Sequence, residues 1–200
     1  RCKPPPKSFN NMITYIYRMT CIIGLKQDDK LVVGADTRVT SGGHIINTEA
    51  NKLIEKDGTI MGICGYMRFA DIIRSQFSVP PKPEGKSDQD FLSTEFANSM
   101  RTCLEGVKMV ELKDGMSWIP DSAMIIVYKN NIYSMGSDYS ICAHTDYAAE
   151  GSGTDYALGS LHATSGLSLD PKTRVTMALD AACKFNAWCA PPYTIIERNL

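Results

Sequence analysis

The sequence lacks the features that mark membrane-bound and nucleic-acid-binding proteins. Its apolar stretches, such as residues 21–25, are far shorter than the ~20 residues that a membrane-spanning helix needs. Its net charge is −1, from 21 basic and 22 acidic residues, which argues against a general attraction to nucleic acid or to an anionic membrane. Internal repeats and low-complexity tracts are also missing. We therefore expect neither a nucleic-acid partner nor a membrane partner.

Metal-binding and disulfide patterns are missing as well. The seven cysteines form no close Cys-x-x-Cys pair, and we interpret them as reduced thiols of a cytoplasmic protein. The three histidines (His44, His144 and His162) are scattered, and none pairs with a cysteine at zinc-finger spacing. The chain has no Gly-x-Ser-x-Gly elbow, no Walker loop and no His-Glu-x-x-His motif. We expect no metal and no cofactor.

What remains is typical of one soluble globular domain, with 200 residues, 44% of them hydrophobic and 22% charged. The apolar patterns predict strands first, then two helices, more strands, and two further helices. This order differs from the βαβ alternation of a parallel sheet. It predicts an α+β fold, a four-layer αββα sandwich in which two antiparallel sheets pack between helix pairs. The predicted strands lie at 21–26, 30–35, 44–48, 52–55, 59–64, 122–128, 132–136, 140–144 and 194–197, and the predicted helices at 68–77, 92–110, 154–165 and 171–189.

Two details of this prediction concern pairing and burial. Residues 21–26 and 30–35 should form a hairpin, and residues 44–48 and 52–55 could form a second pair. In the last helix, one face should carry Val175, Leu179, Ala182, Phe185 and Cys189.

The first nineteen residues differ in character from the rest of the chain. They open basic and proline-rich, and they end at a Met19–Thr20 junction. A secretory signal would need a longer apolar stretch and a small-residue cleavage site. The segment is either a propeptide or a leader ahead of a true initiator at Met19, and in both cases its removal exposes Thr20. We expect residues 1–19 to be a leader or propeptide and residues 20–200 to be a single domain.

Charged residues follow Thr20 at informative distances. Asp36 lies sixteen residues after Thr20 (36 − 20), Lys52 lies thirty-two residues after it (52 − 20), and Arg38 lies between them. Each residue alone is typical of a solvated turn or a surface charge. Together they resemble the start of proteasome β-subunits and HslV-type peptidases. In that family the mature chain begins with threonine, an Asp-x-Arg-x-Thr turn follows, and the catalytic lysine lies thirty-two residues on; Thr40 and Gly42 are also in register.

The resemblance covers most of the chain. Gly151-Ser152-Gly153 before Tyr156-Ala157 is similar to the family's Gly-Ser-Gly-x-x-Tyr-Ala, whose serine supports the nucleophile. The glycine turn at residues 62–65 makes Gly65 the expected oxyanion donor. In the last predicted helix, the proteasome pattern Arg-Asp-Ala-x-Ser-Gly falls on residues 185–190. There Asn186 replaces the acid and Cys189 replaces the serine, a place where HslV-type enzymes also depart from the pattern.

The resemblance implies a threonine-type endopeptidase of the N-terminal-nucleophile hydrolase superfamily. Thr20 would be the nucleophile, and its free α-amine, with a pKa near 8, would act as base. Lys52 would favour the alkoxide, Asp36 would hold Lys52, Ser152 would assist, and Arg38, Asn186 and Cys189 would support the site. The resemblance also implies peptide or unfolded-protein substrates, a homo-oligomeric ring, and an ATP-dependent unfoldase as a candidate partner.

Two alternatives remain open from the residues. Asn186, Cys189 and an uncleaved leader would suit a catalytically silent ring or structural subunit of the same fold. Cys21 lies beside Thr20, and related N-terminal hydrolases use cysteine, so a Cys21-dependent small-molecule amidase is the second alternative.

Overall fold

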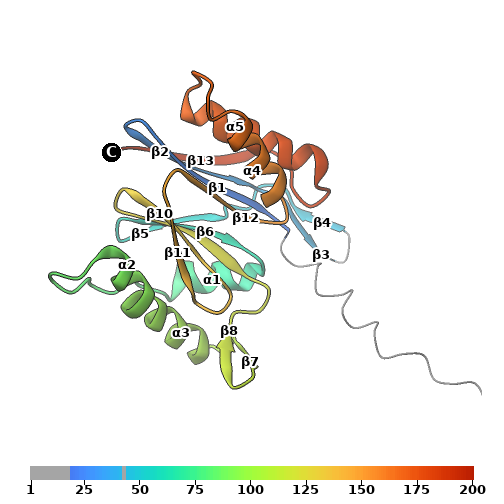
Figure 1. Ribbon diagram of the computed structural model, residues 1–200. Helices are drawn as coiled ribbons and strands as arrows, with labels where there is room; N and C mark the ends of the chain where they lie inside the picture. The colour runs from blue at the N-terminus through green and yellow to red at the C-terminus, as the bar shows by residue number, and fades with distance from the viewer. Residues whose placement is uncertain (1–18, 42–43) are drawn as a thin grey trace, which may run out of the picture.

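The chain folds into four layers, as the sequence predicts (Figure 1). This computed structural model describes residues 19–41 and 44–200. The expected leader, apart from Met19, and the turn residue Gly42 lie outside the described residues. Helices α4 and α5 cover one sheet, the second sheet packs beneath it, and helices α1 to α3 cover the outer face of that second sheet.

The first sheet has four antiparallel strands in the order β12-β1-β2-β13. Its two central strands are apolar runs rich in β-branched residues, joined by a tight turn at Asp28-Asp29, as predicted. The strands are β1 (Cys21–Gln27), β2 (Lys30–Asp36), β12 (Tyr147–Gly151) and β13 (Tyr193–Asn199).

The second sheet has five antiparallel strands in the order β11-β10-β9-β6-β5. Two separate hairpins, β3–β4 and β7–β8, project from the sandwich (Figure 1). These strands are β3 (Val39–Ser41), β4 (His44–Asn47), β5 (Leu53–Lys56), β6 (Thr59–Cys64), β7 (Glu111–Lys113), β8 (Met116–Trp118), β9 (Ala123–Tyr128), β10 (Asn131–Met135) and β11 (Ile141–His144).

Two of the helices, α2 and α5, begin at residues whose side chains cap them. The Ser87 side chain accepts a hydrogen bond from the Asp90 amide, and the Asp170 side chain accepts one from the Thr173 amide. Among the described residues, no helix is both long and apolar enough to cross a membrane. The helical segments are α1 (Met67–Ser75), α2 (Asp88–Phe91), a π-helical turn η2 (Leu92–Phe96), α3 (Ala97–Gly106), α4 (Thr154–Ala163) and α5 (Pro171–Phe185).

Three buried clusters hold the layers together, one at each layer boundary. Strand β1 belongs to two of them, because alternate side chains of a strand face opposite sides. Ile22 packs between the two sheets, whereas Cys21 and Ile23 pack under α4 and α5. β1 is therefore buried on both faces and forms hydrogen-bonded ladders on both edges.

The predicted pairing of residues 44–48 with 52–55 is wrong. β4 pairs with β3, and β5 pairs with β6. The reason is the turn between β5 and β6, where Asp57 and Gly58 both have positive φ (50° and 74°). Two such residues form the tight turn that joins adjacent antiparallel strands, so the turn selects β6 as the partner of β5.

The predicted extent of the last helix is also wrong. α5 ends at Phe185, and Asn186 has an extended backbone (φ −112°, ψ 118°). Phe185 is exposed and does not share the buried face with Val175. The Asn186 side chain accepts a hydrogen bond from the Trp188 amide at 2.9 Å and donates one to the Ser152 carbonyl at 2.6 Å. The first of these contacts is an Asx turn, which competes with continuation of the helix. Asn186 and Cys189 consequently lie in the connection after α5.

Candidate active site

The residues singled out in the sequence meet at one end of the two sheets, because each lies at the end of an element. Antiparallel pairing places the start of β1 beside the ends of β2 and β12. Thr20 directly precedes β1, and Asp36 ends β2. Lys52 directly precedes β5, and Gly65 directly follows its partner β6. Ser152 directly follows β12, so five elements converge on one point.

A buried ion pair forms the base of this site. Lys52 Nζ lies 2.8 Å from Asp36 Oδ1, and their side chains are 4% and 0% exposed. Asp36 also accepts hydrogen bonds from three backbone amides, those of Cys21 (2.9 Å), Arg38 (3.1 Å) and Ala190 (3.3 Å). The carboxylate therefore fixes the lysine and ties together the start of β1, the chain after β2 and the chain before β13.

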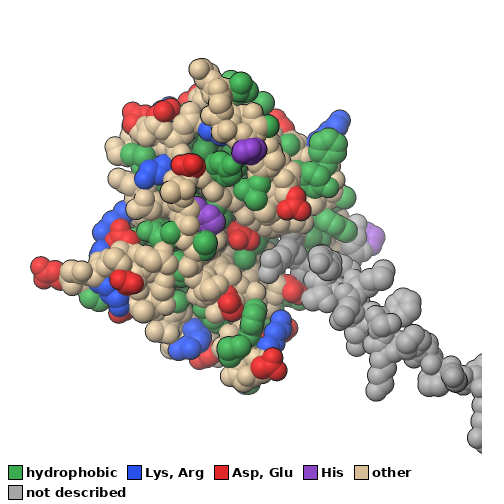
Figure 2. All heavy atoms as spheres, viewed as in Figure 1, with side chains coloured by type: hydrophobic (Ala, Val, Ile, Leu, Met, Phe, Trp, Pro, Cys, Tyr) green, Lys and Arg blue, Asp and Glu red, His purple; other side chains and the backbone are tan. Residues whose placement is uncertain are grey.

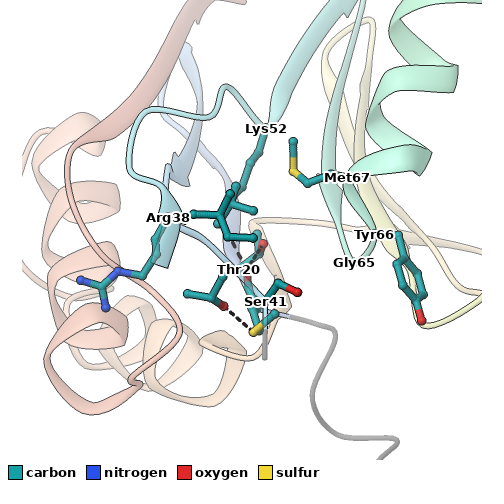
Figure 3. Close-up of a pocket in the computed structure, with 11 residues that line it drawn as sticks. Thr20, Arg38, Ser41, Lys52, Gly65, Tyr66 and Met67 are labelled. Carbon is teal, nitrogen blue, oxygen red and sulfur yellow. Dashed lines mark hydrogen bonds between the residues drawn. The ribbon is translucent and has the colours of Figure 1, made fainter. Parts of the chain in front are cut away.

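Thr20 lies next to this pair, at the same cavity as Lys52. Its hydroxyl donates a hydrogen bond to the carbonyl oxygen of Met19, and Lys52 Nζ lies 3.5 Å from the same oxygen. The Lys52 side chain runs toward Thr20 (Figure 3). A hydroxyl, a cation and a peptide carbonyl are thus held together at the Met19–Thr20 bond.

Ser152 contacts Thr20, and Asn186 in turn contacts Ser152. The Thr20 amide donates to Ser152 Oγ at 3.4 Å, and Ser152 Oγ donates to Asn186 Oδ1 at 3.3 Å. Asn186 Nδ2 in turn donates to the Ser152 carbonyl at 2.6 Å. Cys189 Sγ lies 3.8 Å from Ser152 Oγ. Burial, followed by the negative charge of Asp36, raises the pKa of the Cys189 thiol to about 12, so the thiol stays neutral.

Gly65 borders the cavity in front of Thr20. Its φ is +110°, a backbone conformation that favours glycine. A Cβ atom at this position would lie 2.3 Å from Ser122 Oγ and 2.5 Å from the Asp121 carbonyl oxygen. Only glycine therefore fits at the end of β6 where the chain passes the site.

The cavity has a volume of about 240 Å³. It opens beside Thr20 and Lys52, and β3, β4 and the start of α1 form its walls (Figure 3). The sequence had not indicated these wall residues. Val39, Ser41 and Ile46 lie on the short hairpin β3–β4, which carries no periodic pattern, and Tyr66 and Met67 lie at the start of α1. Thr40, which also lines the cavity, was marked only through the family motif.

Arg38 contributes to the site from a distance. Its guanidinium points away from Thr20 (Figure 3) and donates to the Ala187 carbonyl at 3.0 Å. This contact ties the turn after β2 to the segment after α5, which carries Asn186 and Cys189. Arg38 thus lines the cavity, while its guanidinium braces the segment after α5.

Cys21 is a poor candidate for a nucleophile. Its side chain is fully buried in the cluster beneath α4 and α5. Burial, followed by the charges of nearby groups, raises the pKa of this thiol well above its usual value. The geometry thus disfavours the Cys21-dependent amidase. In the part of the chain that the structure describes, no group of three or more His, Cys, Asp or Glu residues is placed to hold a metal ion.

Charge does not gather on the visible face of the molecule, where acidic and basic side chains are mixed (Figure 2). This distribution agrees with the net charge of −1.

No protein-family model and no curated protein matches the sequence, whereas solved structures match the fold closely. The BPH protein of Thiobacillus denitrificans is 20% identical, with a TM-score of 0.79 over 90% of this chain and 98% of its own. Its complex with epoxomicin gives a TM-score of 0.78, at 20% identity, over 90% and 99% of the two chains. Eukaryotic HslV from Trypanosoma brucei is 15% identical, with a TM-score of 0.65 over 90% of this chain and 100% of its own. The predicted αββα fold is confirmed, and it is the fold of BPH and of HslV.

Proposed function

We propose that this chain is a threonine-type endopeptidase whose nucleophile is Thr20 after removal of residues 1–19. The observation that carries the proposal is the convergence on one peptide carbonyl of the Thr20 hydroxyl and the Lys52 ammonium, with Lys52 held by a buried Asp36. The fold shared with BPH and HslV supports the same reading.

Removal of the leader by Thr20 itself follows from this geometry. Thr20 Oγ would attack the Met19 carbonyl carbon, and its proton would pass to the departing Thr20 nitrogen as the C–N bond breaks. The product is an ester between Met19 and the Thr20 side chain. Water would then hydrolyse this ester, which releases the leader with a new carboxylate and leaves Thr20 with a free α-amine.

Peptide hydrolysis would repeat these steps on a bound substrate. The free amine of Thr20 would take the hydroxyl proton and return it to the leaving amine. Lys52 would stabilise the alkoxide and Asp36 would keep Lys52 in place. The backbone amide at Gly65 would stabilise the tetrahedral oxyanion. Water would then cleave the acyl-enzyme and regenerate the threonine, so the reaction consumes one water molecule for each bond.

The replacement of the family's acid by Asn186 is compatible with this chemistry. The amide of Asn186 donates to the Ser152 carbonyl and accepts from the Ser152 hydroxyl. Ser152 Oγ is thereby left to accept from the Thr20 nitrogen. Asn186 thus orients Ser152 without a negative charge, which favours an active subunit over the silent alternative.

Assembly into a homo-oligomeric ring, action on peptides or unfolded proteins, and a link to an ATP-dependent unfoldase are further proposals that rest on the family resemblance. The mass of the native particle, measured at two protein concentrations, tests the ring directly. A monomer at micromolar concentration would contradict it.

The decisive experiment measures the intact mass of the chain before and after exposure to epoxomicin, the ligand in the BPH complex. Epoxomicin is a peptide epoxyketone, which reacts with the hydroxyl and the free α-amine of one residue. We expect a chain that begins at Thr20 and gains one inhibitor. Thr20→Ala should gain none, whereas Thr102→Ala, which changes an exposed threonine on α3, should react like the parent.

Each contrary result has a distinct meaning. A parent that cleaves peptides while it retains residues 1–19 would refute Thr20 as nucleophile, because an acylated amine cannot act as base. A chain that begins at Thr20 but neither reacts nor cleaves peptides would establish the silent subunit.

A further inference from the structure

A buried serine packs against the glycine whose amide is the oxyanion donor of the proposed reaction. Ser122 directly precedes β9, and it is fully buried. The pairing of β6 with β9 ends at Cys64 and Ala123, so Ser122 lies beside Gly65, one step beyond the last pair. A Cβ atom on Gly65 would lie 2.3 Å from Ser122 Oγ and 2.7 Å from Ser122 Cα. The two residues are therefore in direct contact.

The hydroxyl of Ser122 has a fixed orientation. It donates to the Pro120 carbonyl at 2.8 Å, and this contact uses its one proton. Ser122 Oγ accepts a hydrogen bond from the Tyr66 amide at 3.3 Å. The hydroxyl thus joins the chain before β9 to the turn that follows β6.

Gly65 is consequently held on both sides. Before it, Cys64 belongs to the β6–β9 ladder, and Cys64 Sγ donates to the Ala123 carbonyl at 3.3 Å. After it, the Tyr66 amide is held by Ser122. Glycine has more backbone freedom than any other residue, and these contacts restrict that freedom at the edge of the cavity, near Thr20 (Figure 3).

From this arrangement we propose that Ser122 is a positioning residue of the peptidase. By holding the Tyr66 amide, its hydroxyl fixes the Gly65 amide where the oxyanion of the tetrahedral intermediate forms. This inference rests on the proposed function and adds to it a residue that is not among those lining the cavity. Oxyanion donors are effective because they are oriented before the charge develops. A loose turn would therefore weaken binding of the transition state more than binding of the substrate.

A purely structural role is the competing explanation, because helix α1 begins directly after Tyr66. The Tyr66 carbonyl accepts from the Phe69 amide at 3.0 Å. Loss of the Ser122 hydroxyl removes an acceptor from the Tyr66 amide and should lower stability under either explanation. The two roles differ in what happens at each folded site. A structural residue changes the number of active molecules, whereas a positioning residue changes the rate at which each one reacts.

Threonine and valine at position 122 form a matched pair of variants. The two side chains are nearly equal in size, but only threonine keeps a hydroxyl that can accept from the Tyr66 amide. Any steric effect of the added methyl group is shared and cancels in their comparison. Thr59→Val is the control, because Thr59 is fully buried at the far end of β6 and its hydroxyl has no hydrogen-bond partner among the described residues.

Epoxomicin can measure the two roles separately. Thr20 Oγ would add to its ketone, and the electron pair of the C=O bond would move to the ketone oxygen, which becomes an oxyanion. The maximal rate of adduct formation, kinact, therefore reports the oxyanion site. The concentration that gives half of this rate, KI, reports binding of the inhibitor. The final extent of labelling reports the fraction of chains that are active.

The test follows the intact mass of each full chain over time at several epoxomicin concentrations. We expect kinact of Ser122→Val to be at least ~10-fold below that of Ser122→Thr, less than the ~10²–10³-fold cost of deleting an oxyanion donor. KI should agree within ~2-fold between the two, because the inhibitor binds before the oxyanion forms. Thr59→Val should match the parent in kinact. A folded Ser122→Val chain that keeps its leader, while Ser122→Thr loses it, would also support the role, since leader removal passes through a tetrahedral intermediate as well.

The contrary outcomes separate this inference from the proposed function. Ser122→Val and Ser122→Thr chains that behave alike, in kinact or in retention of the leader, would overturn the role of the hydroxyl. A Ser122→Val chain that differs only in the extent of labelling or in KI would show that Ser122 is structural. Both results leave the peptidase standing if the parent gains its adduct. A parent that begins at Thr20 and gains none would overturn the proposed function and this inference with it.

Discussion

Asp36→Asn should destabilise the chain more than Lys52→Met, although both substitutions break the same buried ion pair. The difference arises because the two partners are held differently. Lys52 Nζ has Asp36 as its close acceptor at 2.8 Å, with the Met19 carbonyl at 3.5 Å. Asp36 accepts from Lys52 and from three backbone amides as well.

The magnitudes follow from these contacts. Removal of one partner of a buried pair costs about 3–5 kcal/mol. After Lys52→Met, three backbone amides still stabilise the Asp36 carboxylate. We therefore expect the free energy of unfolding to fall by an amount near the lower end of this range, about 3 kcal/mol. Asparagine at position 36 leaves Lys52 buried without a counter-ion. The asparagine side chain also replaces one carboxylate oxygen by an NH2 group, which is a donor. This group must face either the backbone amides of Arg38 and Ala190 or the Cys21 amide and the Lys52 ammonium, which are donors as well. Each buried donor left without an acceptor adds about 1–3 kcal/mol, so the total reaches about 5 kcal/mol or more.

The assay is urea unfolding followed by tryptophan fluorescence. All variants carry Thr20→Ala, so that processing does not change the length of the chain. One protein concentration is used throughout, because association raises apparent stability. The double variant Asp36→Asn/Lys52→Met should be no less stable than Asp36→Asn, since it removes the stranded ammonium. A free energy of unfolding for Asp36→Asn within about 1 kcal/mol of the parent's, or above that of Lys52→Met, would refute the anchoring role of Asp36.

The remaining predictions concern catalysis and pH. Lys52→Met should lower kcat/KM by at least ~10²-fold because it removes charge stabilisation in the transition state. The control Lys172→Ala changes an exposed lysine and should match the parent. Near-parental turnover of Lys52→Met would mean that Lys52 has only a structural role. Gly65→Ala should lower both activity and stability, because its Cβ would clash with Ser122 and Asp121. Gly58 also has a positive φ but has open space around it, so Gly58→Ala should lower stability alone. Equal losses of activity in the two variants would contradict the oxyanion role of Gly65. Burial and the charge of Asp36 raise the pKa of Cys189 to about 12, so the folded chain keeps a proton that the unfolded chain loses above pH ~9. Stability from this thiol is therefore complete below pH ~9 and declines as the pH rises toward 12, by about 1.4 kcal/mol between pH 8 and 10. Urea unfolding at these two pH values should show a smaller decline in the free energy of unfolding for Cys189→Ala than for the parent. Equal declines would refute the raised pKa of Cys189.

The layer order was predictable because it depends on local patterns. The β1–β2 hairpin and the alternation of strand and helix blocks each follow from nearby residues. The convergence of Thr20, Asp36 and Lys52 was predictable only through the spacing shared with a known family. No periodicity places the ends of β1, β2 and β5 together.

Features that depend on distant contacts escaped prediction. β12 has an unremarkable sequence, Tyr-Ala-Ala-Glu-Gly, and becomes a strand because β1 offers it a partner edge. The hairpin β3–β4 has exposed side chains along β4 and no apolar alternation to indicate its pairing. The end of α5 depends on the contacts of the Asn186 side chain with Trp188 and Ser152, since the apolar spacing alone extends past Phe185. The walls of the cavity include the β3–β4 hairpin, so they escaped prediction for the same reason.

The position of β1 inside its sheet bears on how a newly made chain end behaves. The ends of most chains fray, because few contacts hold them. Cleavage before Thr20 would create an end that leads directly into a strand paired on both edges, with the Thr20 carbonyl held by the Gly153 amide at 3.2 Å. Gly151, whose φ is +109°, lets β12 approach so closely that a Cβ there would lie 2.1 Å from that carbonyl oxygen. If Thr20 is the nucleophile as proposed, the entropy of ordering this terminus would be lost once, during folding, and would not be lost again in each catalytic cycle.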